Sequence, residues 1–397
     1  MTDTLRIKLA TKVCIVGAGP SGLLLSQLLH LDGIDSIVLE RRGRAHVERR
    51  VRAGLIEQRS VEVLREAGVA ERLDREGLVH EGFELRFDGQ EHRVPFTELT
   101  GQTVHMYGQQ EVVKDLIAAR LAAGGRLHFD VADVKVARLA SDGAVVHCEV
   151  GGEPAEIACD FVAGCDGFHG VCRTAIPAHE IVCHEYLYPF AWLGILADAP
   201  PLSAELIYAV GGRGFALQSM RSPTVSRLYL QVPPEEGVDD RTDEQIWREL
   251  DLRLTGGAGT LPTGAVLERT LVSLRGFVAE PMGYGRLFLV GDAAHIVPPS
   301  AAKGLNLAVA DARLLAEGLV SWYRSGRRDT LDSYSSTALR RAWMGQKFSA
   351  WMTSFLHTSP EESAFERGIR RARFDELTGS PEAAAHFARQ YVGVSRR

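Results

Sequence analysis

The sequence predicts an α/β protein in which a dinucleotide-binding domain is combined with a β-rich insertion and a helical C-terminal segment. Three observations support this fold class: a strand, glycine loop, helix and strand near the N-terminus, alternating strand patterns over residues 183–276, and a mostly helical pattern from 305 to 389. The 397 residues suffice for two domains. We expect a nucleotide domain at 1–181 that is completed by 277–320, a β-rich domain at 182–276 and a helical segment at 321–397.

The N-terminal unit begins with a short apolar strand at residues 12–16 and ends with a second strand at 36–40, with an apolar helix pattern between them. The loop before the helix has the Rossmann fingerprint Gly17-x-Gly19-x-x-Gly22. The first glycine makes the turn, the second lets the backbone approach a pyrophosphate, and the third lets the helix pack closely on the strand. Glu40 ends the second strand 18 residues after Gly22 (22 to 40), where an acidic residue accepts hydrogen bonds from a ribose.

Two further loops follow predicted buried strands. Asp166-Gly167 comes after the strand at 160–164, and Gly291-Asp292 comes after the strand at 287–290. Each loop alone is equally compatible with an ordinary turn that ends a strand. Before the first of these loops the chain is β-like at 82–107 and helical at about 110–123, and between the two loops it becomes β-rich from 183 onward.

The β-rich region contains a predicted hairpin, with Phe215–Arg221 and Ser226–Val232 flanking a Ser-Pro-Thr turn. Ser219 and Arg221 are two residues apart and so lie on one strand face, as do Arg227 and Tyr229 on the returning strand. A hydroxyl, a guanidinium and a phenol on one face suit a small carboxylate, because arginine grips a carboxylate with two parallel N–H groups. The alternative is a solvated β-face with ordinary charges.

Composition excludes several classes of protein. With 45% apolar and 24% charged residues the chain is neither disordered nor fibrous, and its net charge of −6 argues against a nucleic-acid partner. The six cysteines lack CxxC spacing, so we expect reduced core thiols and no metal site. Neither a signal peptide nor a run of about 18 apolar residues is recognisable, so we expect a cytoplasmic protein without a membrane span.

The three loops in this order resemble the class A FAD-dependent aromatic monooxygenases, which have a glutathione-reductase-like fold. The resemblance runs essentially end to end. It is carried further by the segment from His295 to Asn306 (HIVPPSAAKGLN) and by the Tyr391-Val-Gly tripeptide. It implies that FAD is the cofactor, that Asp292 contacts the flavin ribose and pyrophosphate, and that Asp166 and Gly167 serve both FAD and the nicotinamide nucleotide.

The resemblance also implies contacts for the rest of both nucleotides. The expected FAD contacts are Arg50, Arg52, Gln109, Lys303, Gly304 and Asn306, the last three at the flavin's pyrimidine end, in addition to the residues of the loops. The expected contacts of the nicotinamide nucleotide are Arg41, Arg42, Arg52, His169 and Arg173. The arginine cluster at 41–52 favours NADPH as the electron donor, with NADH as the alternative.

For the substrate, the resemblance implies a small aromatic acid whose carboxylate binds Arg221, aided by Ser219 and Tyr229. Tyr208 and Tyr391 would form a relay that takes the proton from the substrate phenol, with His80 as its solvent-side end. The resemblance links Arg227 to flavin movement and places the Pro299 carbonyl near the substrate hydroxyl. Trp192 is interpreted as packing.

The activity implied is hydroxylation of 4-hydroxybenzoate to 3,4-dihydroxybenzoate with O2 and NAD(P)H through a flavin C4a-hydroperoxide. Two alternatives stay open: the same chemistry on 3-hydroxybenzoate, 4-aminobenzoate or a dihydroxybenzoate, and a non-hydroxylating flavoprotein such as a sensor, a reductase or a halogenase. The WxWxIP-like tryptophan motif expected of a halogenase is absent. The helical tail resembles the family's dimer-forming region, so a homodimer is expected.

Overall fold

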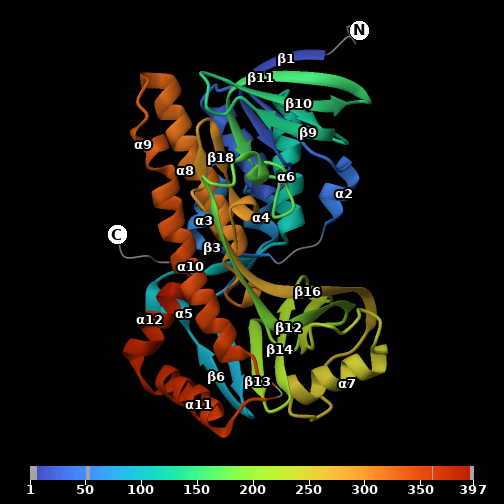
Figure 1. The fold of residues 1–397 in the computed structure, drawn as a ribbon. Coiled ribbons are helices and arrows are strands. Elements are labelled where there is room, and N and C mark those ends of the chain that lie inside the picture. The colour runs from blue at the N-terminus through green and yellow to red at the C-terminus, as the bar shows by residue number, and fades with distance from the viewer. Residues whose placement is uncertain (1–6, 51–53, 360, 394–397) are drawn as a thin grey trace.

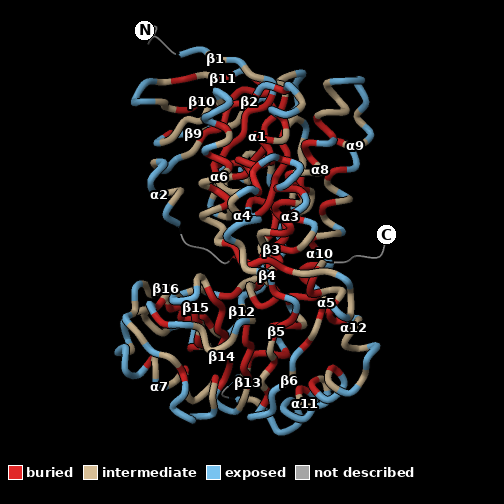
Figure 2. Tube along the Cα trace, turned by 180° about the vertical axis from the view of Figure 1, so that it is seen from behind, coloured by how far each residue is buried: buried red, intermediate tan, exposed pale blue. Residues whose placement is uncertain are grey.

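The computed structural model describes residues 7–50, 54–359 and 361–393. An α/β body and a β-rich body lie one above the other, and the C-terminal helices run along both (Figure 1). The buried residues continue through the two bodies (Figure 2). Among the described residues, no helix has both the length and the apolar character needed to cross a membrane.

The sheet of the α/β body has a parallel core in the order β18-β11-β1-β2-β8. The strand predicted at 12–16 is confirmed, but it starts earlier, at residue 7, because its first half pairs with β11. The helix predicted after the glycine loop is α1 (Pro20–Leu31), which packs on α6 (Gln109–Ala122) and α8 (Gly304–Ser325). The strands of this sheet are β1 (Ile7–Val16), β2 (Ser36–Leu39), β8 (Arg126–His128), β9 (Ala132–Ala137), β10 (Ala144–Val150), β11 (Glu153–Gly164), β17 (Gly283–Tyr284) and β18 (Leu287–Leu289).

The sheet of the β-rich body has the order β19-β16-β12-β15-β14-β13-β5-β6. The predicted hairpin is confirmed as β14 and β15, in which Ser219 pairs with Arg227. Two strands, β5 and β6, come from residues 83–94, inside the segment predicted as nucleotide domain, and β5 pairs in parallel with β13. The strands are β5 (Phe83–Phe87), β6 (Gln90–Val94), β12 (Val182–Asp198), β13 (Leu206–Gly211), β14 (Gly214–Met220), β15 (Ser226–Val232), β16 (Ala265–Glu280) and β19 (His295–Ile296).

The two faces of this second sheet have different partners. One face packs on α7 (Asp243–Leu254), and its core includes Ile207 and Leu228. The other face packs on the C-terminal helices and is rich in aromatic residues, among them Tyr208 and Phe215. Because side chains alternate along a strand, residues two apart on β13, β14 and β15 share a face.

A three-stranded sheet, β3-β7-β4, lies between the two bodies (Figure 1). The stretch 82–107, expected to be β-like, also contains a short helix, α5, which ends at Gly101 in the left-handed conformation. The elements of this region are β3 (Leu55–Glu57), β4 (Leu78–His80), β7 (Val104–Met106), α2 (Arg44–Arg49), α3 (Gln58–Glu66), α4 (Glu71–Glu76) and α5 (Phe96–Thr100).

The helical pattern predicted from 305 onward is confirmed. Helix α10 lies beside α8 in the α/β body and reaches β13 and the turn η3 (Pro299–Ala301) at the β-rich body (Figure 1). The remaining helical elements are α9 (Asp329–Asp332), α10 (Tyr334–Leu356), α11 (Ala364–Gly379), α12 (Pro381–Tyr391) and the turns η1 (Arg173–Ala175) and η2 (Gly291–Ala293). Five of the six cysteines are buried, whereas Cys183 is exposed and is no core thiol.

Candidate active site

A cavity of about 740 Å³ opens where β1, β2 and β11 end. The first glycine of the fingerprint, Gly17, lines it together with Glu40, Arg41, Asp166 and His169, and residues 131–136 close the other side. Ligands of parallel α/β sheets bind at the carboxyl ends of the strands, so this is the expected place for a dinucleotide.

The three fingerprint glycines differ in what surrounds them. Gly17 has φ +108°, and a Cβ there would lie 2.2 Å from the Cys165 carbonyl oxygen; a Cβ on Gly22 would lie 2.1 Å from the Gly17 oxygen. No heavy atom lies within 4 Å of a Cβ built on Gly19. Gly17 and Gly22 are therefore required by the protein's own packing, whereas the open side of Gly19 fits a pyrophosphate. Helix α1 begins there without a side-chain cap, which leaves backbone N–H groups for the phosphates.

Replacing Gly19 by alanine should weaken FAD binding without harming the fold. The added methyl group meets no protein atom but occupies the space of the pyrophosphate, and a tight fit of this kind costs about 1–3 kcal/mol, or roughly tenfold or more in Kd. FAD titration of the apoprotein measures the effect. Gly368→Ala, on the exposed side of α11 with equally open surroundings, is the matched control. Equal FAD affinity in both variants contradicts the prediction.

Two carboxylates of the cavity are oriented by backbone N–H groups. Glu40 accepts hydrogen bonds from Ala18 N–H (2.9 Å) and Arg42 N–H (2.8 Å), which ties it to the glycine loop. Asp166 accepts one from Cys172 N–H (2.9 Å), while its Oδ1 is buried without a hydrogen-bond partner. Burial raises the pKa of Asp166. A buried acceptor without a donor fits a ligand hydroxyl such as that of a ribose.

The residues expected to bind the nicotinamide nucleotide lie in different surroundings. Arg41 and His169 line the cavity, and Arg42 is exposed beside it. Arg173 instead donates to the carbonyls of Phe168 (2.6 Å) and Ala293 (2.9 Å), so its guanidinium is held within the protein.

The Gly291-Asp292 loop is fixed by a pair that sequence analysis missed. Asp311 Oδ2 accepts from Gly291 N–H (3.2 Å) and lies 2.6 Å from His295 Nε2, with both side chains buried. Burial opposes protonation of His295, but Asp311 outweighs it and raises the pKa of the imidazole. This pair leaves Asp292 exposed at the end of β18.

Lys303 and Asn306 are engaged by the protein itself. Lys303 Nζ donates to Glu57 Oε1 and to the Tyr391 carbonyl, each at 2.6 Å. Asn306 accepts from Glu57 N–H (2.9 Å) and donates to Leu55 O (3.2 Å). These side chains therefore tie the start of α8 to β3, and their expected place at the flavin's pyrimidine end stays a prediction. Beside them, Gly304 begins α8 with no atom within 4 Å of a Cβ.

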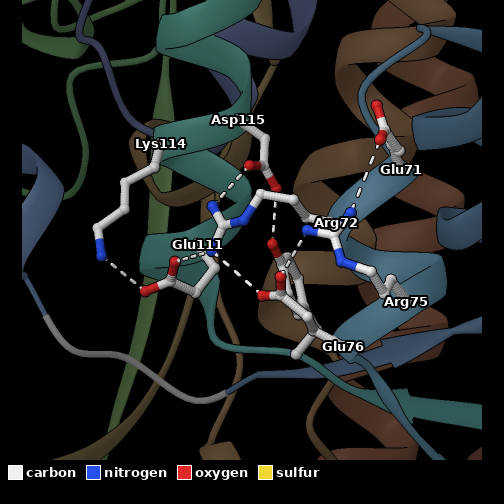
Figure 3. Close-up of polar contacts among 8 residues, drawn as sticks. Glu71, Arg72, Arg75, Glu76, Glu111, Lys114 and Asp115 are labelled. Atoms are coloured by element: carbon white, nitrogen blue, oxygen red, sulfur yellow. Dashed lines mark hydrogen bonds and ion pairs between the residues drawn. The ribbon is translucent and has the colours of Figure 1, made fainter.

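A network of charged side chains joins α4 to α6 (Figure 3). Arg72 donates to Asp115 Oδ1 (2.7 Å) and Glu111 Oε2 (2.5 Å), and Lys114 binds the other oxygen of Glu111 (2.7 Å). Tyr107 donates its hydroxyl to Asp115 Oδ2 (2.7 Å). Burial, followed by the hydrogen bond to Asp115, raises the pKa of this tyrosine.

This network fixes the turn that carries Gln109, one of the expected flavin contacts. The backbone N–H of Tyr107 donates to the Gly54 carbonyl (2.8 Å). A Cβ on Gly54 would lie 2.4 Å from the backbone carbonyl oxygen of Tyr107. Gly54 thus allows two backbone segments to touch beside the start of α6. Arg50 directly follows the last residue of α2, and Arg52 lies outside the described residues.

The aromatic face of the second sheet gathers most of the expected substrate residues. Tyr208, Leu217, Tyr229, Gly194 and Thr270 pair one after another across five strands, which places them on one face. A Cβ on Gly194 would lie 2.8 Å from Thr270 Oγ1 and 3.1 Å from the Tyr229 ring, so the glycine makes room for these side chains.

The two tyrosines of the expected relay are in contact. The hydroxyls of Tyr208 and Tyr391 are 3.2 Å apart, and Tyr208 donates to the Ser300 carbonyl (3.1 Å). Both rings are buried, and burial raises the pKa of each phenol. The neighbouring Pro299 carbonyl, which the resemblance places near the substrate hydroxyl, accepts from Ala302 N–H (3.0 Å), and its place near the substrate stays a prediction.

His80, expected at the solvent-side end of the relay, is almost fully buried at 1% exposure. Its Nε2 has no hydrogen-bond partner, and burial lowers its pKa to about 4. The imidazole is therefore neutral near pH 7 and has no hydrogen bond to either tyrosine.

The two arginines of the hairpin are held differently. Arg227 donates to Thr270 Oγ1 (2.6 Å) and pairs with Glu268 (3.5 Å). Arg221 donates to Ser219 Oγ (3.4 Å) and Met220 O (3.2 Å), and its Nε is buried without a partner. Within the described residues Arg221 forms no ion pair, and burial lowers its pKa. Arg221 is half-buried, and a cation with a buried, unpartnered N–H group is stabilised when an anion joins it.

A histidine that sequence analysis missed supports this face. Trp192 Nε1–H donates to His357 Nε2 (2.6 Å), and His357 Nδ1 lies 2.8 Å from the Thr353 carbonyl. Burial lowers the pKa of His357 to about 3. No local signal could have found this pair, because its members are 165 residues apart.

The depressed pKa of His357 predicts acid destabilisation. An unfolded histidine binds a proton near pH 6.5, and the folded His357 only near pH 3. The contribution of the neutral His357 to the free energy of unfolding is therefore complete above about pH 6.5 and decreases by about 1.4 kcal/mol per pH unit below it. Between about pH 7 and pH 5 the wild type should lose about 2 kcal/mol more than His357→Gln. Urea unfolding at the two pH values measures the difference, and equal losses contradict the prediction.

Comparison with known proteins agrees with this site. A family model described as an FAD binding domain matches residues 10–349. The fold also matches p-nitrophenol 4-monooxygenase from Pseudomonas putida, with a TM-score of 0.81 at 18% identity over 98% of this chain and all of that one. Because the family model covers most of the chain, the chain belongs to this FAD-binding family, and its cofactor is FAD.

A specific relative lies close to it within the family. The p-hydroxybenzoate hydroxylase of Acinetobacter baylyi is 46% identical over 386 residues, which cover 97% of this chain and 95% of the relative. The rifampicin monooxygenase of Streptomyces venezuelae is more distant, at 29% identity over 80% of this chain and 66% of the relative.

Proposed function

We propose that this enzyme hydroxylates 4-hydroxybenzoate to 3,4-dihydroxybenzoate. The overall reaction inserts one oxygen atom of O2 into the ring C–H bond ortho to the hydroxyl, while NAD(P)H and a proton reduce the other atom to water. The reduced flavin supplies the chemistry that activates O2. The protein's own residues would bind the acid, remove its phenolic proton and exclude water.

The observation that carries the proposal is Arg221, a half-buried cation whose Nε is buried without a partner, directly after β14, the strand in which Leu217 pairs with Tyr208. A carboxylate would complete Arg221, with Ser219 and Tyr229 beside it. Tyr208 and Tyr391 then offer hydroxyls for a phenol, and a negative ring oxygen makes the ortho carbon more nucleophilic. The name of the 46% identical relative supports the same substrate.

An assay of coupled turnover tests the proposal. Purified holoenzyme is mixed with NADPH or NADH and a panel of benzoates, and both nucleotide oxidation and chromatographic products are measured. We expect 4-hydroxybenzoate to stimulate oxidation and to yield 3,4-dihydroxybenzoate. Stronger turnover of 3-hydroxybenzoate, 4-aminobenzoate or a dihydroxybenzoate, or peroxide as the only product, overturns the assignment.

NADPH is the proposed electron donor, with NADH as the alternative. Arg41 and Arg42 support it, since both are exposed cations beside the cavity and suit a 2′-phosphate. In steady-state assays we expect a lower KM for NADPH than for NADH. We expect the KM for NADPH to rise when Arg42 is changed to serine.

We also propose a cytoplasmic homodimer. The six unpaired cysteines support the compartment. Phe365 (77% exposed) and Ile369 (43%) are one turn apart on α11 and support an apolar contact through the helical tail. Light scattering of the wild type and of Phe365→Glu measures whether the dimer forms and depends on this face.

A further inference from the structure

We infer that His357 is a positioning residue for the carboxylate end of the substrate site, because it fixes the Trp192 indole against which the Tyr229 ring rests. This inference rests on the proposed function, in which Tyr229 and Arg221 hold the carboxylate.

The hydrogen bonds of His357 define its state. A neutral imidazole has one donor and one acceptor nitrogen. Nδ1 lies 2.8 Å from a carbonyl oxygen, that of Thr353, so it carries the proton, and Nε2 accepts from the Trp192 N–H at 2.6 Å. An indole N–H can only donate, so His357 supplies the partner that this buried tryptophan needs.

Aromatic rings hold the imidazole in place. Phe190 stacks on it with centroids 4.4 Å apart and an interplanar angle of 4°, and Phe215 lies 4.7 Å away. Burial keeps the ring neutral, with a pKa of about 3, so the acceptor nitrogen is available throughout the physiological range.

Trp192 passes this constraint to the carboxylate end. Its ring lies 5.0 Å from Tyr229, and Tyr229 in turn lies 5.2 Å from the Arg227 guanidinium. Trp192 on β12 and Tyr229 on β15 are diagonal neighbours, because Tyr229 pairs with Gly194, which lies two residues after Trp192. A tilt of the indole would therefore shift the Tyr229 phenol, which the proposed function places at the substrate carboxylate.

The same turn of α10 also supports the phenol end of the site. Thr353, one turn before His357, has its hydroxyl 2.9 Å from that of Ser300, whose carbonyl accepts from Tyr208. One helix thus sets the positions of both ends, and the loss of His357 should disturb the carboxylate end alone.

The test compares two ligands of one shape, 4-hydroxybenzoate and the uncharged 4-hydroxybenzamide. Their Kd values are measured on the FAD-loaded enzyme by the change in flavin absorbance. We expect His357→Phe, which keeps a ring but removes the acceptor, to reduce the preference for the carboxylate about tenfold. His357→Gln, which can accept at the same place, should keep the preference within about threefold.

Trp192→Phe removes the indole N–H that donates to His357 and should reduce the preference for the carboxylate to a similar extent. This variant provides the same test if the His357→Phe protein does not bind FAD. Adding His357→Phe to Trp192→Phe should then change little more. A lower melting temperature with an unchanged preference in both variants overturns the inference and indicates a purely structural role. If the wild type itself shows no preference for the carboxylate, the proposed function fails instead.

Discussion

Replacing Tyr208 by phenylalanine is expected to lower the rate of 3,4-dihydroxybenzoate formation by roughly a hundredfold or more, while NADPH oxidation continues and yields peroxide. The substitution removes the hydroxyl that lies 3.2 Å from the Tyr391 hydroxyl and 3.1 Å from the Ser300 carbonyl. A free phenol titrates near pH 10, so without this relay little of the substrate is deprotonated near neutrality. Product chromatography beside nucleotide and peroxide assays measures the uncoupling.

Tyr334→Phe provides the matched control for this change. Tyr334 is equally buried and donates to the Leu289 carbonyl (2.8 Å), but it packs in the core of the α/β body. The substitution Tyr334→Phe should lower the free energy of unfolding and leave the coupling of NADPH oxidation to hydroxylation unchanged. Full coupling in Tyr208→Phe, or equal uncoupling in both variants, contradicts the relay.

Replacing Arg221 by glutamine is expected to weaken 4-hydroxybenzoate binding by roughly a hundredfold. The change removes a charge-assisted hydrogen-bond donor from a buried site, which costs about 2–4 kcal/mol, and 1.4 kcal/mol corresponds to a factor of ten. Arg221→Lys should recover part of the affinity, because it restores the charge without the planar pair of donors. Flavin absorbance titration gives the Kd values.

The uncharged 4-hydroxybenzamide is the internal control for Arg221. Its affinity should change by much less than that of the acid, since it brings no negative charge to the guanidinium. An equal loss for both ligands would mean that Arg221 acts by supporting the sheet and not by binding the carboxylate.

Sequence analysis succeeded where the signal is local. The glycine loop is a short motif and the 226–232 strand alternates over a few residues, so the first parallel strands and the hairpin could be predicted. Helix α5 was missed because its five residues lie between strands and offer too short a pattern.

The parts of the site that were missed depend on contacts between distant residues. Lys303 binds Glu57 across 246 positions, and Tyr208 donates to Ser300 across 92. No spacing rule connects such pairs, and a single histidine such as His357 has no distinctive neighbours along the chain. The resemblance indicated Lys303 and Tyr208 as site residues, but it did not indicate that they bind Glu57 and Ser300.

Three strands of the β-rich sheet, β5, β6 and β19, come from outside the predicted β-rich segment. This has a consequence for the design of domain fragments. A fragment of residues 182–276 would lack both flanking contributions, so β13 and β16 would each lose a pairing partner. Unpaired strand edges invite association between chains. The two bodies are therefore not separable modules, and swapping the β-rich part between relatives requires residues 83–94 and 295–296 to be exchanged with it.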